Sequence, residues 1–132
     1  MAFTTPTEDI IVQEGTFAFD YLCSGTIIKG QGVNAIGTMA VEAPTTTGVE
    51  FVPGCLGVAA YDQSHGSHIA VYGPGNICRI SVSGTGVAVG DELFLVEEGK
   101  FREGAFANAS GISVIALETQ GTADGSCRVM LL

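Results

Sequence analysis

GVAVGDELFLVEEGKFRE, residues 86–103, is the stretch that indicates the class of fold. Within it, Gly90-Asp91 supplies a tight bend into the apolar run that follows, and Glu98-Gly99 supplies the turn into a second run. Glycine beside a polar side chain is the usual chemistry of a short β-hairpin. We find no 3.6-residue apolar period of helical length here or elsewhere in the chain. The stretch therefore predicts two antiparallel strands joined by a tight turn.

Short apolar runs of the same kind recur along the whole chain. Each is rich in Val, Ile, Leu or Phe and is bounded by Gly, Pro, Asn, Asp or Thr, and the 19 glycines favour turns over helices. The sequence therefore predicts an all-β fold, a compact sandwich or small barrel of short strands with an extended N-terminal arm. The segment EGAFANASG (103–111) is the one that could form a helical turn. The other expected strands are DIIVQEG (9–15), GTIIKG (25–30), GTMAVEAP (37–44), GVEFVPG (48–54), CLGVAAYD (55–62), HIAVYG (68–73), NICRISVSG (76–84), SVIALE (113–118) and CRVMLL (127–132).

Length and charge limit the classes of protein to consider. The 132 residues suit one domain, residues 11–132, preceded by an arm of residues 1–10. The net charge is −9 and the few cationic side chains are scattered, so we expect no binding to nucleic acid. No signal-peptide pattern opens the chain and no run approaches the ~18 apolar residues of a membrane span, so we expect no membrane partner. Hydrophobic residues make up 46% and charged residues only 14%, which suggests that another chain covers part of the apolar surface.

The four cysteines leave two interpretations open. Their spacing contains no Cys-x-x-Cys, which gives no support to a zinc knuckle or a thioredoxin-like site. They are either small buried core residues or, in oxidising surroundings, the partners of intersubunit disulfides. We expect two of them, Cys55 and Cys78, to lie nearer the surface than Cys23, because both begin strands beside Pro/Gly turns. The candidates for intersubunit disulfides are Cys23, Cys55, Cys78 and Cys127.

Both histidines of the chain fall in the segment DQSHGSH (62–68). Asp62, His65 and His68 could ligate a divalent ion and serve a metal-dependent enzyme, but a three-residue spacing on a turning backbone need not bring them together. We interpret the segment as a polar turn between two strands. The chain also lacks a Walker lysine and a Gly-x-Ser-x-Gly nucleophile elbow. We therefore expect no metal, no cofactor and no catalytic residue.

An internal similarity supports the interpretation as a turn. Two segments each contain an apolar strand, a polar stretch, a Gly-Ser pair and a second apolar strand. Aligning Gly66–Val71 with Gly125–Met130 places Cys127 at the position of His68, so this position tolerates different residues. The segments are GVAAYDQSHGSHIAVY (57–72) and SVIALETQGTADGSCRVML (113–131).

Several stretches together resemble the small capsid decoration (cement) proteins of tailed bacteriophages, which are sometimes labelled as predicted RecA/RadA-type recombinases. The resemblance covers about residues 11–132, and it lies in the order and spacing of turn and strand motifs. These motifs are IVQEGTFAF (11–19), SGTIIKGQGV (24–33), GCLGVAAYD (54–62), GVAVGDELFLVEEGKF (86–101) and SVIALETQGTADGSCRVMLL (113–132).

The resemblance implies a structural protein without catalytic residues. It implies a β-rich domain on the outer surface of an icosahedral capsid, usually as a homotrimer at local three-fold positions. There it clamps neighbouring major capsid proteins and stabilises the expanded shell, after synthesis in the host cytoplasm. The alternative is a virion-surface module whose loops DQSHGSH (62–68) and PTTTG (44–48) bind a ligand or a host glycan.

We expect contacts with the capsid or with neighbouring subunits from the N-terminal segment and from exposed turns. Residues 1–15 form the reaching arm, and the turns lie at 44–47, 53–54 and 74–76. The contact residues predicted in this way are Phe3, Thr4, Thr5, Pro6, Ile10, Ile11, Pro44, Thr45, Pro53 and Pro74.

Overall fold

Eleven short strands and one 3₁₀ turn make up the regular structure of the residues that the computed structural model describes, which are 11–13, 18–45, 51–84, 86–104, 111–121 and 125–132. The all-β prediction is confirmed, and a barrel is the form observed. In this part of the chain no helix is long and apolar enough to cross a membrane. The elements are β1 (Ile11–Gln13), β2 (Ala18–Cys23), β3 (Gly32–Gly37), β4 (Ala40–Glu42), β5 (Cys55–Ala59), β6 (His68–Tyr72), β7 (Ile77–Ser81), β8 (Glu92–Leu95), η1 (Glu97–Gly99), β9 (Phe101–Glu103), β10 (Val114–Ala116) and β11 (Ser126–Leu131).

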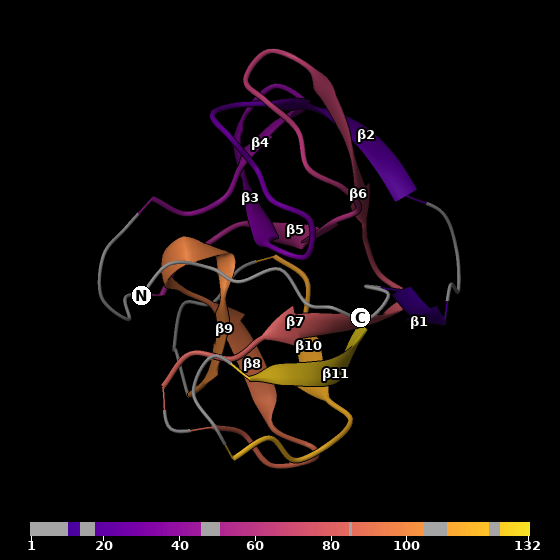
Figure 1. Ribbon diagram of the computed structural model, residues 1–132, viewed down its shortest axis with the longest axis vertical. Helices are drawn as coiled ribbons and strands as arrows, with labels where there is room; N and C mark the ends of the chain where they lie inside the picture. Colours follow the sequence, from indigo (N-terminus) through magenta and orange to yellow (C-terminus); the bar gives the residue numbers. More distant parts are fainter. Residues whose placement is uncertain (1–10, 14–17, 46–50, 85, 105–110, 122–124) are drawn as a thin grey trace.

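The strands form two bodies stacked along the long axis of the molecule (Figure 1). Strands β2-β4-β3-β5-β6 close into a barrel, here called barrel 1. The second sheet has the order β1-β7-β11-β10-β8-β9. Its two sides meet where Val82 bridges Phe101 in parallel and Ser83 N–H donates to Phe101 O at 2.7 Å. Strands β7 to β11 therefore curl into a second barrel, barrel 2, with β1 added along β7.

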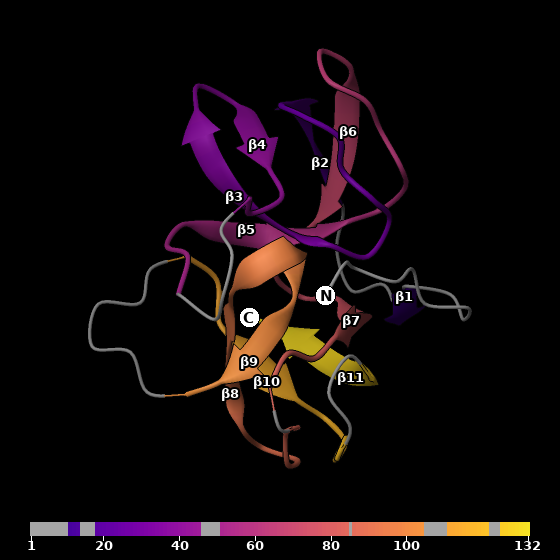
Figure 2. The same ribbon diagram turned by 60° about the vertical axis from the view of Figure 1, so that its left-hand side comes forward.

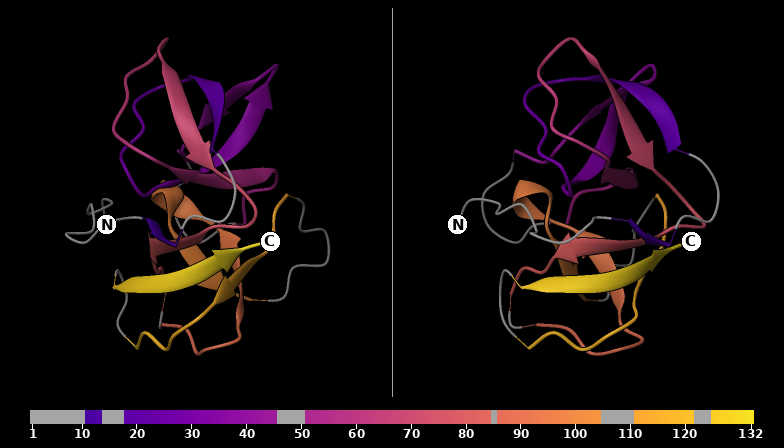
Figure 3. Two further views of the ribbon diagram at one scale, coloured as in Figure 1. Left: turned by 90° about the vertical axis from the view of Figure 1, so that its right-hand side faces the viewer. Right: turned by 45° about the vertical axis from the view of Figure 1, so that its right-hand side comes forward.

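The two barrels repeat one topology. Around barrel 1 the neighbours run β2-β6-β5-β3-β4, and around barrel 2 they run β7-β11-β10-β8-β9. The register agrees as well, since Ala59 pairs with Val71 and Ala116 pairs with Val129. Figure 3 shows β2 beside β6 in barrel 1, and β7 beside β11 in the same relation in barrel 2. Each strand of barrel 1 therefore has a counterpart five strands later.

The same tight turn precedes β3 and β8. Gly30 has φ of 92° and Gly90 has φ of 91°, values that glycine adopts without the cost of a Cβ. The next side chain then closes the turn, because Gln31 Oε1 accepts from Ile28 N–H at 2.8 Å and Asp91 Oδ2 accepts from Ala88 N–H at 2.9 Å. The bend predicted at Gly90-Asp91 is confirmed, and Gly30-Gln31 is its counterpart in barrel 1.

The internal similarity is real, but the predicted register is wrong by one residue. Gln63 Nε2 donates to His68 O at 2.9 Å, and Gln120 Nε2 donates to Ser126 O at 2.8 Å. These bonds make Ser126, not Cys127, the counterpart of His68. The loop after Gln120 is one residue longer than the loop after Gln63, and an ungapped alignment misses this insertion.

Barrel 2 packs on barrel 1 through the turn that joins β8 to β9. Gln31 Nε2 donates to Glu98 O at 2.9 Å across the two barrels. A Cβ on Gly32 would lie only 2.5 Å from Leu95 Cδ1 and 2.6 Å from Phe101 Cζ, so this close contact needs a glycine. The turn predicted at Glu98-Gly99 is confirmed, and it lies at the junction of the barrels (Figure 2).

Two buried clusters form the core. One lies inside barrel 1 and includes Ile27 and Val33. The other fills barrel 2 and extends to Cys55 and Val58 of β5, so β5 contributes to both barrels. This sharing makes the junction part of the hydrophobic core.

Two predicted strands are wrong. In GTIIKG only Ile27 forms a bridge, to Gln63, and the other residues lie outside any strand. In GVEFVPG the described residues 51–54 lie outside any strand, and Val52 N–H donates to Leu95 O instead. The segment expected to form a helical turn lies mostly outside the described residues.

Candidate interaction surfaces

The acidic and histidine side chains of the 62–68 segment hold a neighbouring turn. Asp62 Oδ1 accepts from Lys29 N–H at 2.8 Å, and His65 Nδ1 accepts from Gly25 N–H at 2.9 Å. His68 begins β6 and is exposed. Nowhere in the described ranges do three His, Cys, Asp or Glu side chains gather in a way that could hold a metal ion. In barrel 2, Thr119 Oγ1 accepts from Val89 N–H at 3.2 Å in the place of Asp62, so the role is structural and repeated.

All four cysteines lie within the described residues, are buried and form no disulfide with one another. The expectation that Cys55 and Cys78 lie nearer the surface is wrong. Cys55 and Cys78 both belong to the buried core cluster of barrel 2. Burial favours the interpretation as core residues, and the intersubunit disulfides stay a prediction.

Burial also sets the chemistry of the thiols. It raises the pKa of Cys55 and of Cys78 to about 12. Burial, with the nearby Glu118 carboxylate, raises the pKa of Cys127 to about 11, and burial raises the pKa of Cys23 as well. The nucleophile in cysteine chemistry is the thiolate, so these thiols are unreactive near neutral pH while the fold is closed.

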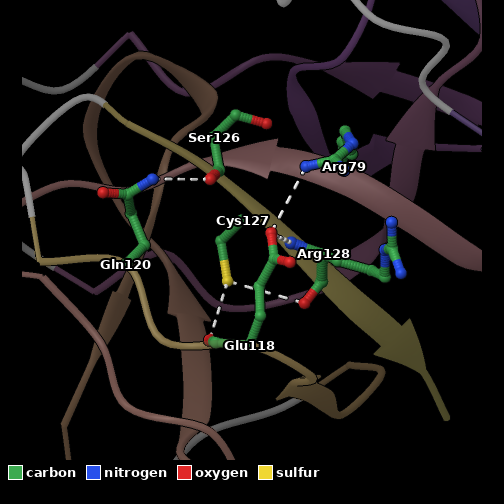
Figure 4. Close-up of polar contacts among 6 residues, drawn as sticks. All are labelled: Arg79, Glu118, Gln120, Ser126, Cys127 and Arg128. Carbon is green, nitrogen blue, oxygen red and sulfur yellow. Dashed lines mark hydrogen bonds and ion pairs between the residues drawn. The ribbon is translucent and has the colours of Figure 1, made fainter.

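A polar cluster ties the segment after β10 to β11 (Figure 4). Arg79 and Arg128 lie opposite each other on β7 and β11, and Glu118 Oε1 accepts from Arg79 Nη1 at 3.3 Å and from Arg128 N–H at 3.0 Å. Cys127 Sγ donates to Glu118 O at 3.5 Å. Glu118 therefore pairs with the guanidinium of Arg79 and with the backbone of Arg128, which joins the segment after β10 to β7 and β11.

The predicted contact residues do not gather at one place. Of the turn residues, Thr45, Pro53 and Pro74 are exposed: the first two lie in the connection between β4 and β5, and Pro74 lies between β6 and β7. Pro44 is buried, so the exposure expected for it is wrong.

Most of the contact residues predicted in the N-terminal arm lie outside the residues that the structure describes. Ile11 pairs with Cys78 as part of β1. The residues Phe3, Thr4, Thr5, Pro6 and Ile10 lie outside the described part of the chain.

Four exposed apolar side chains lie on neighbouring elements of barrel 1, where the sequence did not predict contacts. Four side chains flank β2 and the β3–β4 turn: Phe19 is 48% exposed, Leu22 43%, Ile36 44% and Met39 59%. Leu22 N–H donates to Met39 O at 2.7 Å, which places the turn beside β2.

The matching positions of barrel 2 are buried. Phe19 pairs with Val71 and Cys78 pairs with Val129, so Cys78, which is fully buried, is the counterpart of Phe19. By the same registers Ser81, 4% exposed, is the counterpart of Leu22. Barrel 1 therefore exposes apolar side chains at positions that barrel 2 buries.

Comparisons with known proteins give a likeness in fold. No family model and no curated protein matches the chain. Among solved structures, the chain is similar to the N base of the head fiber gp8.5 of bacteriophage phi29, with a TM-score of 0.58 and 14% sequence identity. The likeness covers 87% of this chain and 92% of that one. The chain therefore shares its fold, over nearly its whole length, with the base of a phage head fiber.

Proposed function

We propose that the chain is a structural protein of a phage virion, bound to the outside of the capsid. The observation that carries the proposal is the fold it shares with a head fiber base over 87% of its length. The motifs that resemble tailed-phage decoration proteins agree with it. So does a composition of 46% hydrophobic and 14% charged residues, which suits a protein partly covered by others.

We further propose that it binds the major capsid protein as a homotrimer at local three-fold positions and stabilises the expanded shell. Three linked contacts can exceed the affinity of one by ~10²–10⁴, so no single contact needs to be tight. The net charge of −9 is compatible with an outer position and not with one against the packaged genome. This proposal assigns no catalytic residue.

Co-sedimentation tests this function directly. The purified protein is mixed with expanded, undecorated capsids and, separately, with unexpanded precursor shells. We expect saturable binding to the expanded shells alone, with a whole-number ratio to capsid subunits. An absence of binding to both kinds of shell would contradict the role on the capsid.

The alternative function, recognition of a ligand or glycan by the 62–68 loop, is not favoured. Asp62 and His65 already use their side chains to hold the turn at 25–29. Specific binding of the isolated protein to a glycan array would restore this alternative.

A further inference from the structure

Strands β7 and β11 turn one face to the core of barrel 2 and the other face outward. Cys127 and Val129 of β11 are buried in that core. Successive side chains of a strand point to opposite faces, so Arg128, between them, points outward. Arg79 lies directly opposite Arg128 on β7. The centre of this outward face therefore carries two arginines.

The guanidinium of Arg128 lacks an acceptor. Among the described residues, three buried side-chain atoms have no hydrogen-bond partner, and two of them, Arg128 Nε and Ser126 Oγ, belong to this face. Glu118 accepts from the guanidinium of Arg79 but only from the backbone of Arg128, and Figure 4 shows the Arg128 guanidinium directed away from it. A buried donor without an acceptor costs free energy. Arg128 is half-buried, so an acceptor from outside the barrel can reach its side chain and stabilise this face.

The equivalent face of barrel 1 carries the opposite charge. Ala70 lies between two residues of β6 that are buried in the barrel, so Ala70 and its partner Asp20 point outward. By the registers of the two barrels, Asp20 is the counterpart of Arg79, and Ala70 is the counterpart of Arg128. Asp20 is exposed, and no described residue pairs with its carboxylate. One face therefore offers an unpaired carboxylate where the other offers an unpaired guanidinium.

The two faces also fit in shape. Sheets that pack face to face keep their strand directions within about 30° of each other. When the centres of the two faces meet, the short side chain of Ala70 leaves room beside Asp20 for the long side chain of Arg128. Leu22, 43% exposed, shares the outward face of Asp20, and Met130 shares that of Arg128. Apolar contacts would therefore flank the ion pair.

The charge of the whole chain limits how two copies can meet. With 14 acidic and 5 basic residues, two copies repel each other in most orientations. A contact between copies is favoured where a cationic side chain of one meets a carboxylate of the other. All five cationic side chains lie within the described residues, and among them only Arg128 has a buried donor without an acceptor. A carboxylate of a second copy supplies that acceptor.

Within one chain the two faces do not meet, because the barrels join through the β8–β9 turn and the core around β5. We propose that the β2/β6 face of one copy packs on the β7/β11 face of the next copy, with Asp20 paired to Arg128. Such a head-to-tail contact closes into a ring when the rotation between copies permits it. The contact rests on the homotrimer proposed above for the number of copies, but it needs no capsid. A failure to bind capsids and a failure to self-associate are therefore separate outcomes.

Exchanging the two charges tests this contact. Sedimentation velocity of the isolated full chain measures its self-association. Asp20→Arg places like charges together and should weaken self-association by ~10-fold or more, and so should Arg128→Glu. The double variant Asp20→Arg/Arg128→Glu restores an opposite pair in exchanged order and should recover most of the lost association.

Glu103→Arg is the matched control, because Glu103 is also an exposed carboxylate on a strand. It reduces the net negative charge as Asp20→Arg does, so general repulsion predicts stronger association for both variants, and the contact predicts weaker association for Asp20→Arg alone. Each variant is first shown to melt as the natural chain does. The two exposed positions keep the test decisive if Arg128→Glu does not fold.

Three results would overturn the proposal. The first is a full chain that stays monomeric, and the second is equal association of Asp20→Arg and Glu103→Arg. The third is a folded double variant that recovers none of the association lost in the single variants.

Discussion

The β3–β4 turn of barrel 1 and the β8–β9 turn of barrel 2 occupy equivalent places in one topology. The first exposes Ile36 and Met39, and the second lies against Gln31 at the junction of the barrels. The strand order is the same, so the difference in burial comes from what each barrel has as a neighbour. In barrel 2, β1 pairs with β7 and the β8–β9 turn contacts barrel 1. No described element contacts the equivalent β3–β4 turn of barrel 1 in this way. A repeated fold thus gives equivalent turns different surroundings, one at the junction of the barrels and one exposed.

The largest expected effect is at the junction. Phe101 is fully buried and contacts Gly32 across the barrels, so Phe101→Ala should lower the free energy of unfolding by about 3–5 kcal/mol. The matched control is Phe19→Ala, the same truncation at a half-exposed site, which should cost much less. Urea unfolding measures both. Equal losses would mean that the two barrels do not share a core.

The next effect compares the two equivalent turn residues. Gln31→Ala leaves both Ile28 N–H and Glu98 O without this partner in a buried place, which should cost about 1–3 kcal/mol. Asp91→Ala frees only Ala88 N–H near solvent and should cost about 0.5–1.5 kcal/mol. Thermal unfolding of the two variants gives the difference. If Asp91→Ala is the more damaging, the hydrogen bond across the barrels contributes nothing.

The buried thiols predict a loss of stability in alkali. Burial raises the pKa of Cys78 to about 12 from an ordinary value of 9.0, so the unfolded chain ionises first as the pH rises. The neutral Cys78 thiol therefore makes its full contribution to the free energy of unfolding below pH 9.0. This contribution is lost as the pH rises from 9.0 to about 12, at up to ~1.4 kcal/mol per pH unit. The free energy of unfolding measured from pH 7 to pH 10.5 should therefore fall less steeply in Cys78→Ala than in the natural chain. Parallel curves would contradict this.

The smallest effect concerns the histidine loop of barrel 1. His65→Ala removes an acceptor from Gly25 N–H at an exposed place, where water can replace it, and should cost less than ~1 kcal/mol. His68→Ala should change even less. Zinc should leave the Tm of all three proteins unchanged. A zinc-dependent rise in Tm that both substitutions abolish would instead establish a metal site.

The sequence predicted the tight turns between strands better than it predicted how the strands close into barrels. Glycine beside a polar residue identified the bends at Gly90-Asp91 and Glu98-Gly99, because such turns depend on neighbours in sequence. The counterpart at Gly30-Gln31 was missed, since a glutamine replaces the aspartate as the closing acceptor. Barrel 2 is closed by the bridge between Val82 and Phe101. A local sequence pattern does not predict a single contact between residues so far apart in the chain.

The candidate surface was harder to predict for the same reason. The hydrophobic content indicated that another chain covers some apolar surface, but not where. The burial of Cys55 was mispredicted because it packs in the core of barrel 2, whose other members lie far along the chain. The exposure of Leu22 and Met39 became informative only beside their covered counterparts in barrel 2.

The division of the chain into two consecutive barrels also has a consequence during synthesis. All strands of barrel 1 come from residues 18–72, and those that close barrel 2 come from residues 77–131. A ribosome adds ~5–20 residues per second, so the first barrel has some seconds to form its pairings before the second is complete. During that interval the face around Gly32 awaits Leu95 and Phe101 and is open to solvent. The nascent chain thus passes through a stage with a temporary apolar face, which the later half of the same polypeptide then covers.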